Sequence, residues 1–462
     1  MKTDKHQHSQ VLMRGSSGWT HSSRILVALV WGAVALAGAS IRSAAQETVC
    51  VRGYCYTVPQ AGDVAVNNGA QYAPQRKAVF EVRDHDQAGV DCTGNSDSSP
   101  FLKRLTATAD TTGTSLTIST RGCPYLRADG WLIHGQEYLE VDLGPKGQGQ
   151  RAQGGTTLFG CSGSGAVLTI DRSGYTNVHG GTIAANHFKC PGHASSLTGS
   201  IEYTNSGPGG YTSTHNVLAD TILTSGANGE AISGYKAYYI HGAPNQEAYR
   251  LQNVDMNCQG SPNSDGFYSD DWNADSTTWD GGGVAGCYHG INMTAGLLRI
   301  SNLNNSGNGG FSVFGSGGAS IFERNGCVTS VVQTVWAEGS GQFMNMANDS
   351  NSHNNCGSPR YWRDNQIGFD DIDPSVYPVN LNSGSISLAG GNVFYTTKSL
   401  ANIHNRVLIG TDDLTIPGLP YLGVYDLGGN GAGASGAPLP SHATPTNGSG
   451  RSYSWYSLGD PW

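Results

Sequence analysis

The chain has 462 residues, of which 66 are glycine and only 13% are charged. Its 21 Tyr, 11 Phe and 9 Trp, together with this low charge, exclude a mainly disordered protein. The 35 acidic residues outnumber the 26 basic ones, and the net charge of −9 excludes partners bound through phosphates, such as nucleic acid.

The first 45 residues are typical of an export signal. Basic residues up to Arg24 precede an apolar run at residues 25–39, and Ser43-Ala44-Ala45 offers a small-residue cleavage site. The apolar run is shorter than the roughly 20 residues that a membrane-spanning helix needs. We therefore expect a secreted or periplasmic protein with no membrane contact beyond the signal, and an uncleaved anchor is the alternative.

All ten cysteines follow this segment. An even number of cysteines in an exported chain favours disulfides over free thiols or a zinc site. Their spacing indicates five local pairs, namely Cys50/Cys55, Cys92/Cys123, Cys161/Cys190, Cys258/Cys287 and Cys327/Cys356.

Short β-prone runs separated by Gly, Asn, Ser and Asp predict an all-β fold. Between residues 241 and 340, glycines recur at intervals of 24 or 25 residues, at Gly242, Gly266, Gly290, Gly315 and Gly339. A period of this length indicates a solenoid, and the absence of a leucine-rich pattern favours a parallel β-helix with three short strands per coil. Residues one period apart would then lie about 4.8 Å apart on neighbouring coils.

The stretch from Phe80 to Asp91, followed by Asn95-Ser96-Asp97 and a short helical run from Phe101 to Ala107, resembles the entry to a known fold. This entry is that of the pectate-lyase-like superfamily of right-handed parallel β-helices. The resemblance implies such a solenoid with a short N-terminal capping helix and a C-terminal cap of β and irregular structure.

Five segments are expected along the chain. A secretion signal at 1–45 precedes an N-terminal strap at 46–75 and a β-helix domain at 76–355. A C-terminal cap at 356–427 and a flexible Gly/Pro-rich tail at 428–462 complete the chain.

The string from Ser261 to Phe267 resembles a motif of polygalacturonase-type glycoside hydrolases (family 28-related). Those enzymes cleave with inversion, using one carboxyl as acid and one carboxylate as base. The resemblance implies that Asp265 is the acid, that Asp270 or Asp271 is the base, and that His289 modulates the site or contacts substrate. The neighbouring rings that we expect to contact sugar are Tyr268, Trp272 and Tyr288.

The glycine repeat indicates a second arrangement of the same residues. The residues before the phased glycines are His241, Asp265, His289, Phe314 and Glu338. Stacking at one residue per coil would place Asp265 between two imidazoles, which suits general acid/base chemistry on a sugar chain. His241 and Glu338 would then be further substrate contacts.

Three functions remain open. The leading hypothesis is a polysaccharide-degrading glycoside hydrolase of pectin or a related polymer, which needs no cofactor or metal. The second is a polysaccharide lyase with an imidazole or phenol base and a cation, for which Lys236 and Arg250 are the nearest candidates, and only this hypothesis implies Ca²⁺. The third is a non-catalytic glycan-binding or surface-attachment protein. The glycan and the oligomeric state are left open by the sequence.

Overall fold

The chain divides into two compact units, residues 1–47 and 48–462, and every residue that the structure describes belongs to the second. The computed structural model describes residues 48–51, 54–57, 77–82, 89–112, 115–147, 154–191, 197–204, 214–226, 231–241, 247–270, 276–306, 318–338, 342–346, 359–368, 379–381, 385–395, 407–410, 423–426, 431–432, 437–438 and 456–457. The predicted export signal lies outside these residues.

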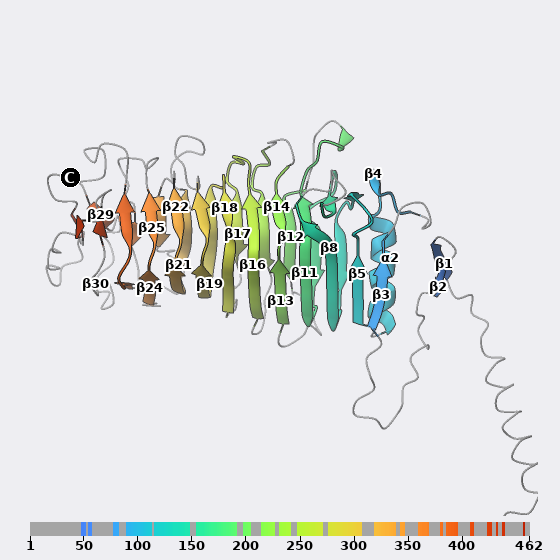
Figure 1. Cartoon of the computed structure of the whole chain (residues 1–462), viewed down its shortest axis with the longest axis horizontal. Coiled ribbons are helices and arrows are strands. Elements are labelled where there is room, and N and C mark those ends of the chain that lie inside the picture. The colour runs from blue at the N-terminus through green and yellow to red at the C-terminus, as the bar shows by residue number, and fades with distance from the viewer. Residues whose placement is uncertain are drawn as a thin grey trace, which may run out of the picture. The chain divides into compact units, whose positions relative to one another are not determined.

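Most strands pair in parallel with the strand one coil earlier and one coil later, which produces three ladders that we call sheets 1, 2 and 3 (Figure 1). Sheet 1 contains β7 (Trp131–His134), β10 (Ala166–Asp171), β12 (Gly199–Thr204), β15 (Lys236–His241), β17 (Asp265–Ser269), the first parts of β19 (His289–Ser301) and β21 (Ala319–Gln333), β23 (Gln342–Met346), β26 (Val379–Leu381) and β29 (Val407–Gly410).

Sheet 2 contains β3 (Lys77–Glu81), β5 (Ser115–Ser119), β8 (Tyr138–Lys146), β11 (Tyr175–Ala184), β13 (Thr214–Ala219), β16 (Glu247–Asn257), β18 (Ser276–Ala285), the last parts of β19 and β21, β24 (Pro359–Arg363), β27 (Ser385–Leu388) and β30 (Gly423–Asp426). Sheet 3 contains β4 (Thr93–Asp97), β6 (Tyr125–Arg127), β9 (Thr157–Phe159), the last parts of β11, β16 and β18, and β14 (Ile222–Thr224), β20 (Asn304–Ser306), β22 (Trp336–Glu338), β25 (Gln366–Gly368), β28 (Val393–Tyr395) and β31 (Gly431–Ala432).

The predicted all-β parallel β-helix is therefore confirmed. Its core consists of inward columns of apolar side chains, because register partners on successive coils point to the same side of a sheet. One column of sheet 1 is buried along its whole described length and consists of Leu168, Ile201, Tyr238, Phe267, Ile291, Ile321, Met344 and Val379. Such columns bury apolar area coil by coil, so each coil is stabilised mainly by its two neighbours.

The corner between sheets 2 and 3 repeats in almost every coil. The chain turns there through one or two residues with positive φ, which include Asp220, Asn253, Gly281, Gly282, Asn302, Thr334, Asp364 and Gly391. Gly, Asn and Asp adopt this left-handed conformation most readily, which explains why they separate the β-prone runs. The spacing between successive corners varies, so the coils differ in length.

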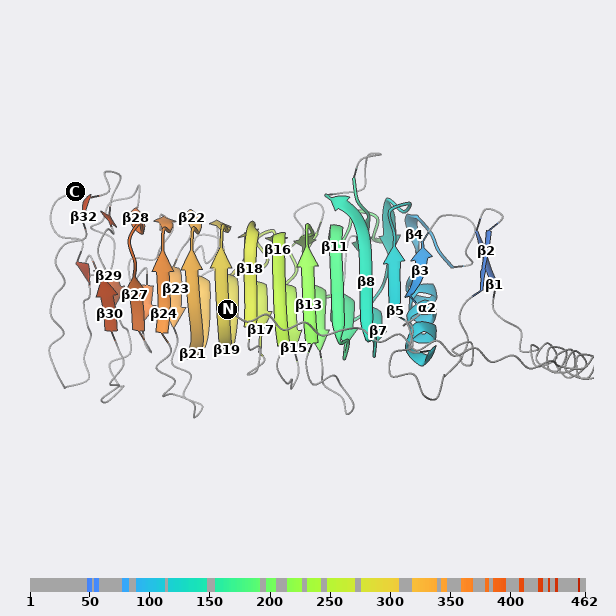
Figure 2. The ribbon, with the colours of Figure 1, turned by 60° about the horizontal axis from the view of Figure 1, so that its bottom comes forward.

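A single helix among the described residues, α2 (Ser99–Thr112), lies at the N-terminal end of the ladders (Figure 2) and packs against β7 and β5. Its start is stabilised by Asp97, whose carboxylate accepts hydrogen bonds from the backbone and hydroxyl of Ser99. Phe101, Leu102 and Leu105 face the core of the first coils and cover it. The predicted capping helix is confirmed.

The described ends of the second unit contain antiparallel pairs. A hairpin of β1 (Thr48–Val51) and β2 (Tyr54–Thr57) stands near the start, and β32 (Ala437–Pro438) and β33 (Tyr456–Ser457) pair with β31 and β29 near the end. These pairs interrupt the parallel stacking only at the C-terminal end, because parallel coils continue through the described strands of 356–427, the segment expected to form the cap.

Three of the five predicted disulfides are present and buried, namely Cys92–Cys123, Cys161–Cys190 and Cys258–Cys287. Cys50 and Cys55 are register partners in the β1–β2 hairpin, but their side chains lie outside the described part of the chain, as do those of Cys327 and Cys356. Three buried disulfides are typical of proteins that fold in an oxidising environment. No helix in the described ranges combines the length and apolarity that crossing a bilayer requires.

Candidate functional site

The outward side of sheet 1 carries two adjacent columns of polar and aromatic side chains. One column follows the register Glu202, Tyr239, Tyr268, Asn292 and Phe322. The other, three residues earlier in each strand, follows the register Lys236, Asp265 and His289. Asn292 contacts Asp265 and the Lys236 ammonium lies over the rings of Tyr239 and Tyr268, so the two columns share one face, which we call the sheet 1 face.

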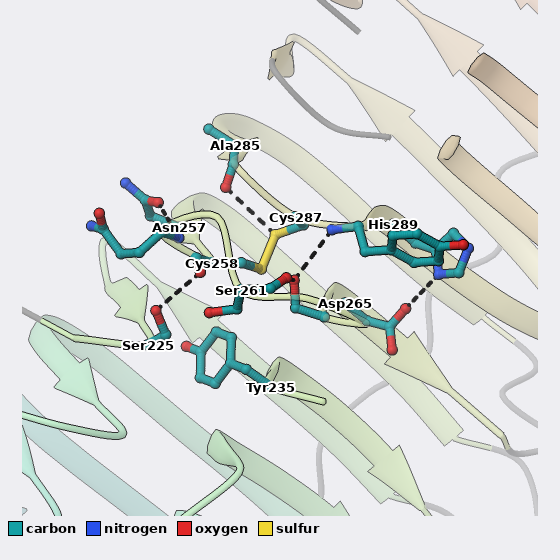
Figure 3. Close-up of a disulfide and its surroundings, with 12 residues drawn as sticks. Ser225, Tyr235, Asn257, Cys258, Ser261, Asp265, Ala285, Cys287 and His289 are labelled. Carbon is teal, nitrogen blue, oxygen red and sulfur yellow. Dashed lines mark hydrogen bonds and ion pairs between the residues drawn. A yellow bond between two sulfur atoms is a disulfide. The ribbon is translucent and has the colours of Figure 1, made fainter. Parts of the chain in front are cut away.

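Asp265 and His289 form a dyad on this face. The Asp265 Oδ1 atom lies 2.9 Å from His289 Nδ1 and accepts a hydrogen bond of 2.9 Å from Asn292 Nδ2 (Figure 3). Asp265 is 5% exposed, so these two contacts replace the water that a carboxylate would otherwise bind. The His289 ring stacks on Phe322 at a centroid distance of 4.5 Å and meets Tyr288 edge-on at 4.5 Å.

The turns before β17 and β19 hold the dyad in place. The Cys258–Cys287 disulfide joins these two turns, which lead directly to Asp265 and His289 (Figure 3). The Ser264 carbonyl accepts a 2.9 Å hydrogen bond from the His289 backbone N–H, and its hydroxyl accepts one of 3.2 Å from the Tyr288 N–H. The string that resembles a catalytic motif therefore also serves as a bracing turn.

Gly266 is required by close packing between coils. A Cβ at this position would lie 2.5 Å from Val284 Cγ2 and 2.6 Å from the carbonyl oxygen of Gly290. Gly266 and Gly290 are superposed, because the residues on either side of them are register partners. The predicted 24-residue interval is thus confirmed for this coil. Gly242, Gly315 and Gly339 lie outside the described residues.

The predicted His241–Asp265–His289 ladder is wrong at His241. The register partner of Asp265 on the preceding coil is Lys236, which is 29 residues earlier rather than 24, and His241 pairs with Thr204. Phe314 lies outside the described residues, and Glu338 lies in β22 of sheet 3, paired with Ser306. The prediction failed because it assumed that every coil has 24 residues. The coil that precedes Asp265 has 29, so a different residue becomes its neighbour.

Asp270 and His241 meet in a second cluster, one coil back from the dyad. Asp270 directly follows β17, and its carboxylate accepts a 2.8 Å hydrogen bond from the Tyr239 hydroxyl and lies 3.0 Å from His241 Nδ1. Burial raises the pKa of Tyr239, and the hydrogen bond to Asp270 raises it further, so the phenol stays protonated. The Lys236 ammonium lies over the rings of Tyr268 at 4.7 Å and Tyr239 at 5.3 Å.

Asp265 and Asp270 face different coils. Five residues of extended chain place their Cα atoms about 16 Å apart, beyond the roughly 6.5–9.5 Å between the carboxyl groups of an inverting hydrolase. Asp265 contacts residues of β19, whereas Asp270 contacts residues of β15. The structure therefore does not bring these two carboxyl groups together.

Glu202, which sequence reasoning missed, completes the second cluster. It is the register partner of Tyr239 and accepts a 3.4 Å hydrogen bond from the Thr169 hydroxyl. Burial raises the pKa of Glu202, and the charge of Asp270 adds to this effect, whereas His241, Thr169 and Lys236 oppose it. Glu202 and Tyr239 are 37 residues apart in the sequence, which does not match the 24-residue period, so their proximity could not be predicted. The only sequence signal was the position of Glu202 between two apolar residues of a strand, which predicts a side chain directed outward.

The other predicted site residues divide between this face and undescribed segments. Tyr268 and Tyr288 lie on the sheet 1 face beside Lys236 and His289, respectively. Asp271 and Trp272 lie outside the described residues. Within the described ranges, no three His, Cys, Asp or Glu side chains converge as metal ligands would.

The chain matches no protein-family model, no curated protein and no solved structure.

Proposed function

We propose that this protein is an exported polysaccharide-degrading glycoside hydrolase in which Glu202 is the general acid and Asp270 the general base. The observation that supports this assignment is the difference between the two carboxyl groups. Burial and the nearby Asp270 charge favour a protonated Glu202, whereas Asp270 is surrounded by the donors Tyr239 and His241. A carboxyl group with a raised pKa, beside a second carboxyl group that accepts hydrogen bonds, can supply the acid and the base that cleave a glycosidic bond.

We expect hydrolysis with inversion, as in the polygalacturonase-type enzymes whose motif the sequence resembles. Glu202 lies on β12 and Asp270 follows β17, two coils away, but the Asp270 carboxylate reaches back to residues of β15. The charge of Asp270 contributes to the raised pKa of Glu202, which supports a pairing of the two carboxyl groups across this face. Glu202 would protonate the leaving oxygen while Asp270 takes a proton from the attacking water.

The surrounding rings support a sugar polymer as the substrate. Tyr239 and Tyr268 belong to the outward column, with Tyr288 one coil and Phe322 two coils beyond Tyr268. Aromatic faces and edges provide apolar contact to sugar rings while the polar groups between them bind hydroxyls. The resemblance of the sequence to pectate-lyase-like β-helices supports the same substrate class.

Product analysis tests this proposal. On a panel of pectins and neutral polysaccharides, we expect new reducing ends without new ultraviolet absorbance. Glu202→Gln should lower kcat by about 10²–10⁴-fold, because the amide cannot donate the proton. Glu140→Gln, on the outward side of sheet 2, is the matched control and should leave kcat unchanged. An unchanged rate in the Glu202 variant would exclude it as the acid.

A lyase is the second candidate, and one observation favours it. Lys236, Asp265 and His289 are successive register partners, so a cation and an Asp-supported imidazole share one column. β-Elimination needs a cation to neutralise the uronate carboxylate and a base to remove the adjacent proton. A rise in ultraviolet absorbance that is lost in His289→Gln would identify this reaction. Affinity without either product would instead identify a glycan-binding protein.

A further inference from the structure

Tyr239 lies between the two carboxyl groups of the proposed hydrolase in the stacking order of the strands. It belongs to β15, which pairs on one side with β12, the strand of Glu202, and on the other side with β17, which Asp270 directly follows. Tyr239 and Glu202 are register partners, on strands about 4.8 Å apart. The Tyr239 hydroxyl donates a 2.8 Å hydrogen bond to Asp270 Oδ2, so it fastens this carboxylate to the coil next to Glu202.

The ring of Tyr239 is held by contacts that do not involve its hydroxyl. The Lys236 ammonium lies 5.3 Å from the ring centroid, and the ring of Tyr268 meets it edge-on at 5.2 Å. The His241 ring packs against it at a centroid distance of 5.1 Å. A phenylalanine at this position should therefore keep the ring in place and lose only the hydrogen bond to Asp270.

The phenol of Tyr239 is a permanent donor in this contact. Burial raises its pKa, and the hydrogen bond to Asp270 raises it further, so the hydroxyl keeps its proton at neutral pH. A hydrogen bond donated to a carboxylate stabilises the ionised form.

Several other titratable or charged groups surround Asp270. In the described part of the chain they are His241 and Lys236 on β15, Tyr268 on β17 and Glu202 on β12. Of the described side chains, only those of Tyr239 and His241 come within hydrogen-bonding distance of the Asp270 carboxylate. An imidazole can gain or lose a proton near neutral pH, whereas the phenol does not, so Tyr239 is the donor whose effect is constant.

We propose that Tyr239 is the positioning residue for Asp270, because its hydroxyl keeps this carboxylate ionised and directed toward the coil next to Glu202. That the carboxylate acts as a general base rests on the proposed hydrolase function. In the reaction Asp270 would take a proton from the attacking water, while Tyr239 keeps its own proton and exchanges nothing with the substrate.

The pH dependence of initial rates tests this role by comparing the wild-type chain with Tyr239→Phe. Loss of the hydroxyl should lower kcat by about 10–100-fold with little change in KM, because the base is misplaced while the ring remains. The acidic limb of kcat/KM should move to higher pH by about one unit, because the ionised carboxylate loses a donor. An acidic limb that does not move would overturn the proposal, since structural damage alone lowers the rate without shifting it.

Two further variants make the test specific. Tyr239→3-fluorotyrosine keeps the ring and makes the phenol a stronger donor, so it should retain activity and move the acidic limb to lower pH, opposite to Tyr239→Phe. Tyr175→Phe is the matched control, because it removes the same atom from an exposed tyrosine of sheet 2, whose ring stacks on Tyr138 at 5.1 Å. The control should change neither the rate nor the limb. Equal shifts in Tyr175→Phe and Tyr239→Phe, or shifts in the same direction for both Tyr239 variants, would overturn the proposal.

Carbon-13 NMR of the carboxyl groups separates this role from the proposed hydrolase. In protein labelled at the aspartate carboxyl carbon, the signal that Asp270→Asn removes belongs to Asp270, and its titration midpoint is measured without substrate. If the wild-type protein makes no reducing ends but Tyr239→Phe raises this midpoint, the positioning of Asp270 stands and the hydrolase assignment fails. If Glu202→Gln stops cleavage but Tyr239→Phe changes neither the midpoint nor the acidic limb, the hydrolase stands and the role of Tyr239 fails.

Discussion

At the scale of single residues, two glutamates show how the environment decides what a carboxyl group can do. Glu323 is fully buried and contacts the guanidinium of Arg360, also fully buried, with Arg360 Nε 2.7 Å from Oε2. Burial raises the pKa of both Glu323 and Glu202, but only at Glu323 does a cation in direct contact oppose this effect within the described residues. The first glutamate is suited to joining two strands, and the second to holding a proton that it can donate.

The raised pKa of Glu202 predicts a shifted pH profile. An acid must be protonated to act, so kcat/KM should fall as the pH rises through this pKa, above the usual range of a glutamate. Lys236 lowers the pKa of Glu202, and Lys236→Met should therefore move this alkaline limb to higher pH. Initial rates measured across the pH range check the shift, and movement to lower pH would contradict it.

The Glu323–Arg360 pair predicts a large loss of stability when only one partner is removed. Arg360→Met should lower the free energy of unfolding by about 3–5 kcal/mol, because it leaves a carboxyl group buried without its cation. The double variant Glu323→Leu with Arg360→Met should recover most of this loss. Urea denaturation measures both, and a double variant as unstable as the single one would contradict the explanation.

At the scale of elements, the lengths of loops and turns determine which functional side chains become neighbours on successive strands. β15 and β17 are joined by a longer segment than β17 and β19, so Lys236, and not His241, precedes Asp265 in its column. The shorter connection between β17 and β19 is the one that the Cys258–Cys287 disulfide spans. The dyad therefore lies directly beside a covalent link between two coils.

If the Cys258–Cys287 disulfide holds the dyad in place, its removal should lower affinity for the substrate as well as stability. Replacing both Cys258 and Cys287 by Ser should cost about 2–4 kcal/mol of stability and weaken binding of polysaccharide, because Asp265 and His289 lose their brace. Replacing Cys161 and Cys190 is the matched control, because this disulfide also spans 29 residues but lies far from the dyad in sequence. The control variant should lose a similar free energy of unfolding, measured with denaturant, but keep its affinity. Equal losses of affinity in the two variants would refute the bracing role.

At the scale of the whole solenoid, stability is the sum of contacts between neighbouring coils, and an open end is a weakness. α2 covers the first coils with Phe101, Leu102 and Leu105, which belong to the same core cluster as Leu116 and Trp131. Without this cover the apolar interior and the free strand edges of the first coil would meet water or another chain.

The cap predicts a strong effect of one helical residue. Leu102 is fully buried, and Leu102→Ala should lower the free energy of unfolding by about 2–5 kcal/mol through the cavity it leaves. Lys103→Ala, on the exposed side of the same helix, should change it by less than about 0.5 kcal/mol. Chemical denaturation compares the two variants, and equal effects would show that α2 does not close the core.

Much of the fold was predictable because its determinants are local. Alternating apolar residues specify strands, and Gly, Asn and Asp mark the left-handed corners. The cysteine spacings also identified Cys92–Cys123, Cys161–Cys190 and Cys258–Cys287, since each bridge spans about one coil. The stacking of Asp265 on His289 could be predicted because that coil keeps the 24-residue interval.

The rest of the candidate site depended on tertiary structure. Glu202 and Tyr239 are 37 residues apart, Lys236 and Asp265 are 29, and Asp265 and His289 are 24. Loops absorb these differences without disturbing the strands, so a constant period misplaces His241 and conceals Glu202. The sequence by itself determined the type of structure, because side-chain periodicity acts within a strand. Only the backbone hydrogen bonds between coils determined which side chains became neighbours, because they set the register after each loop.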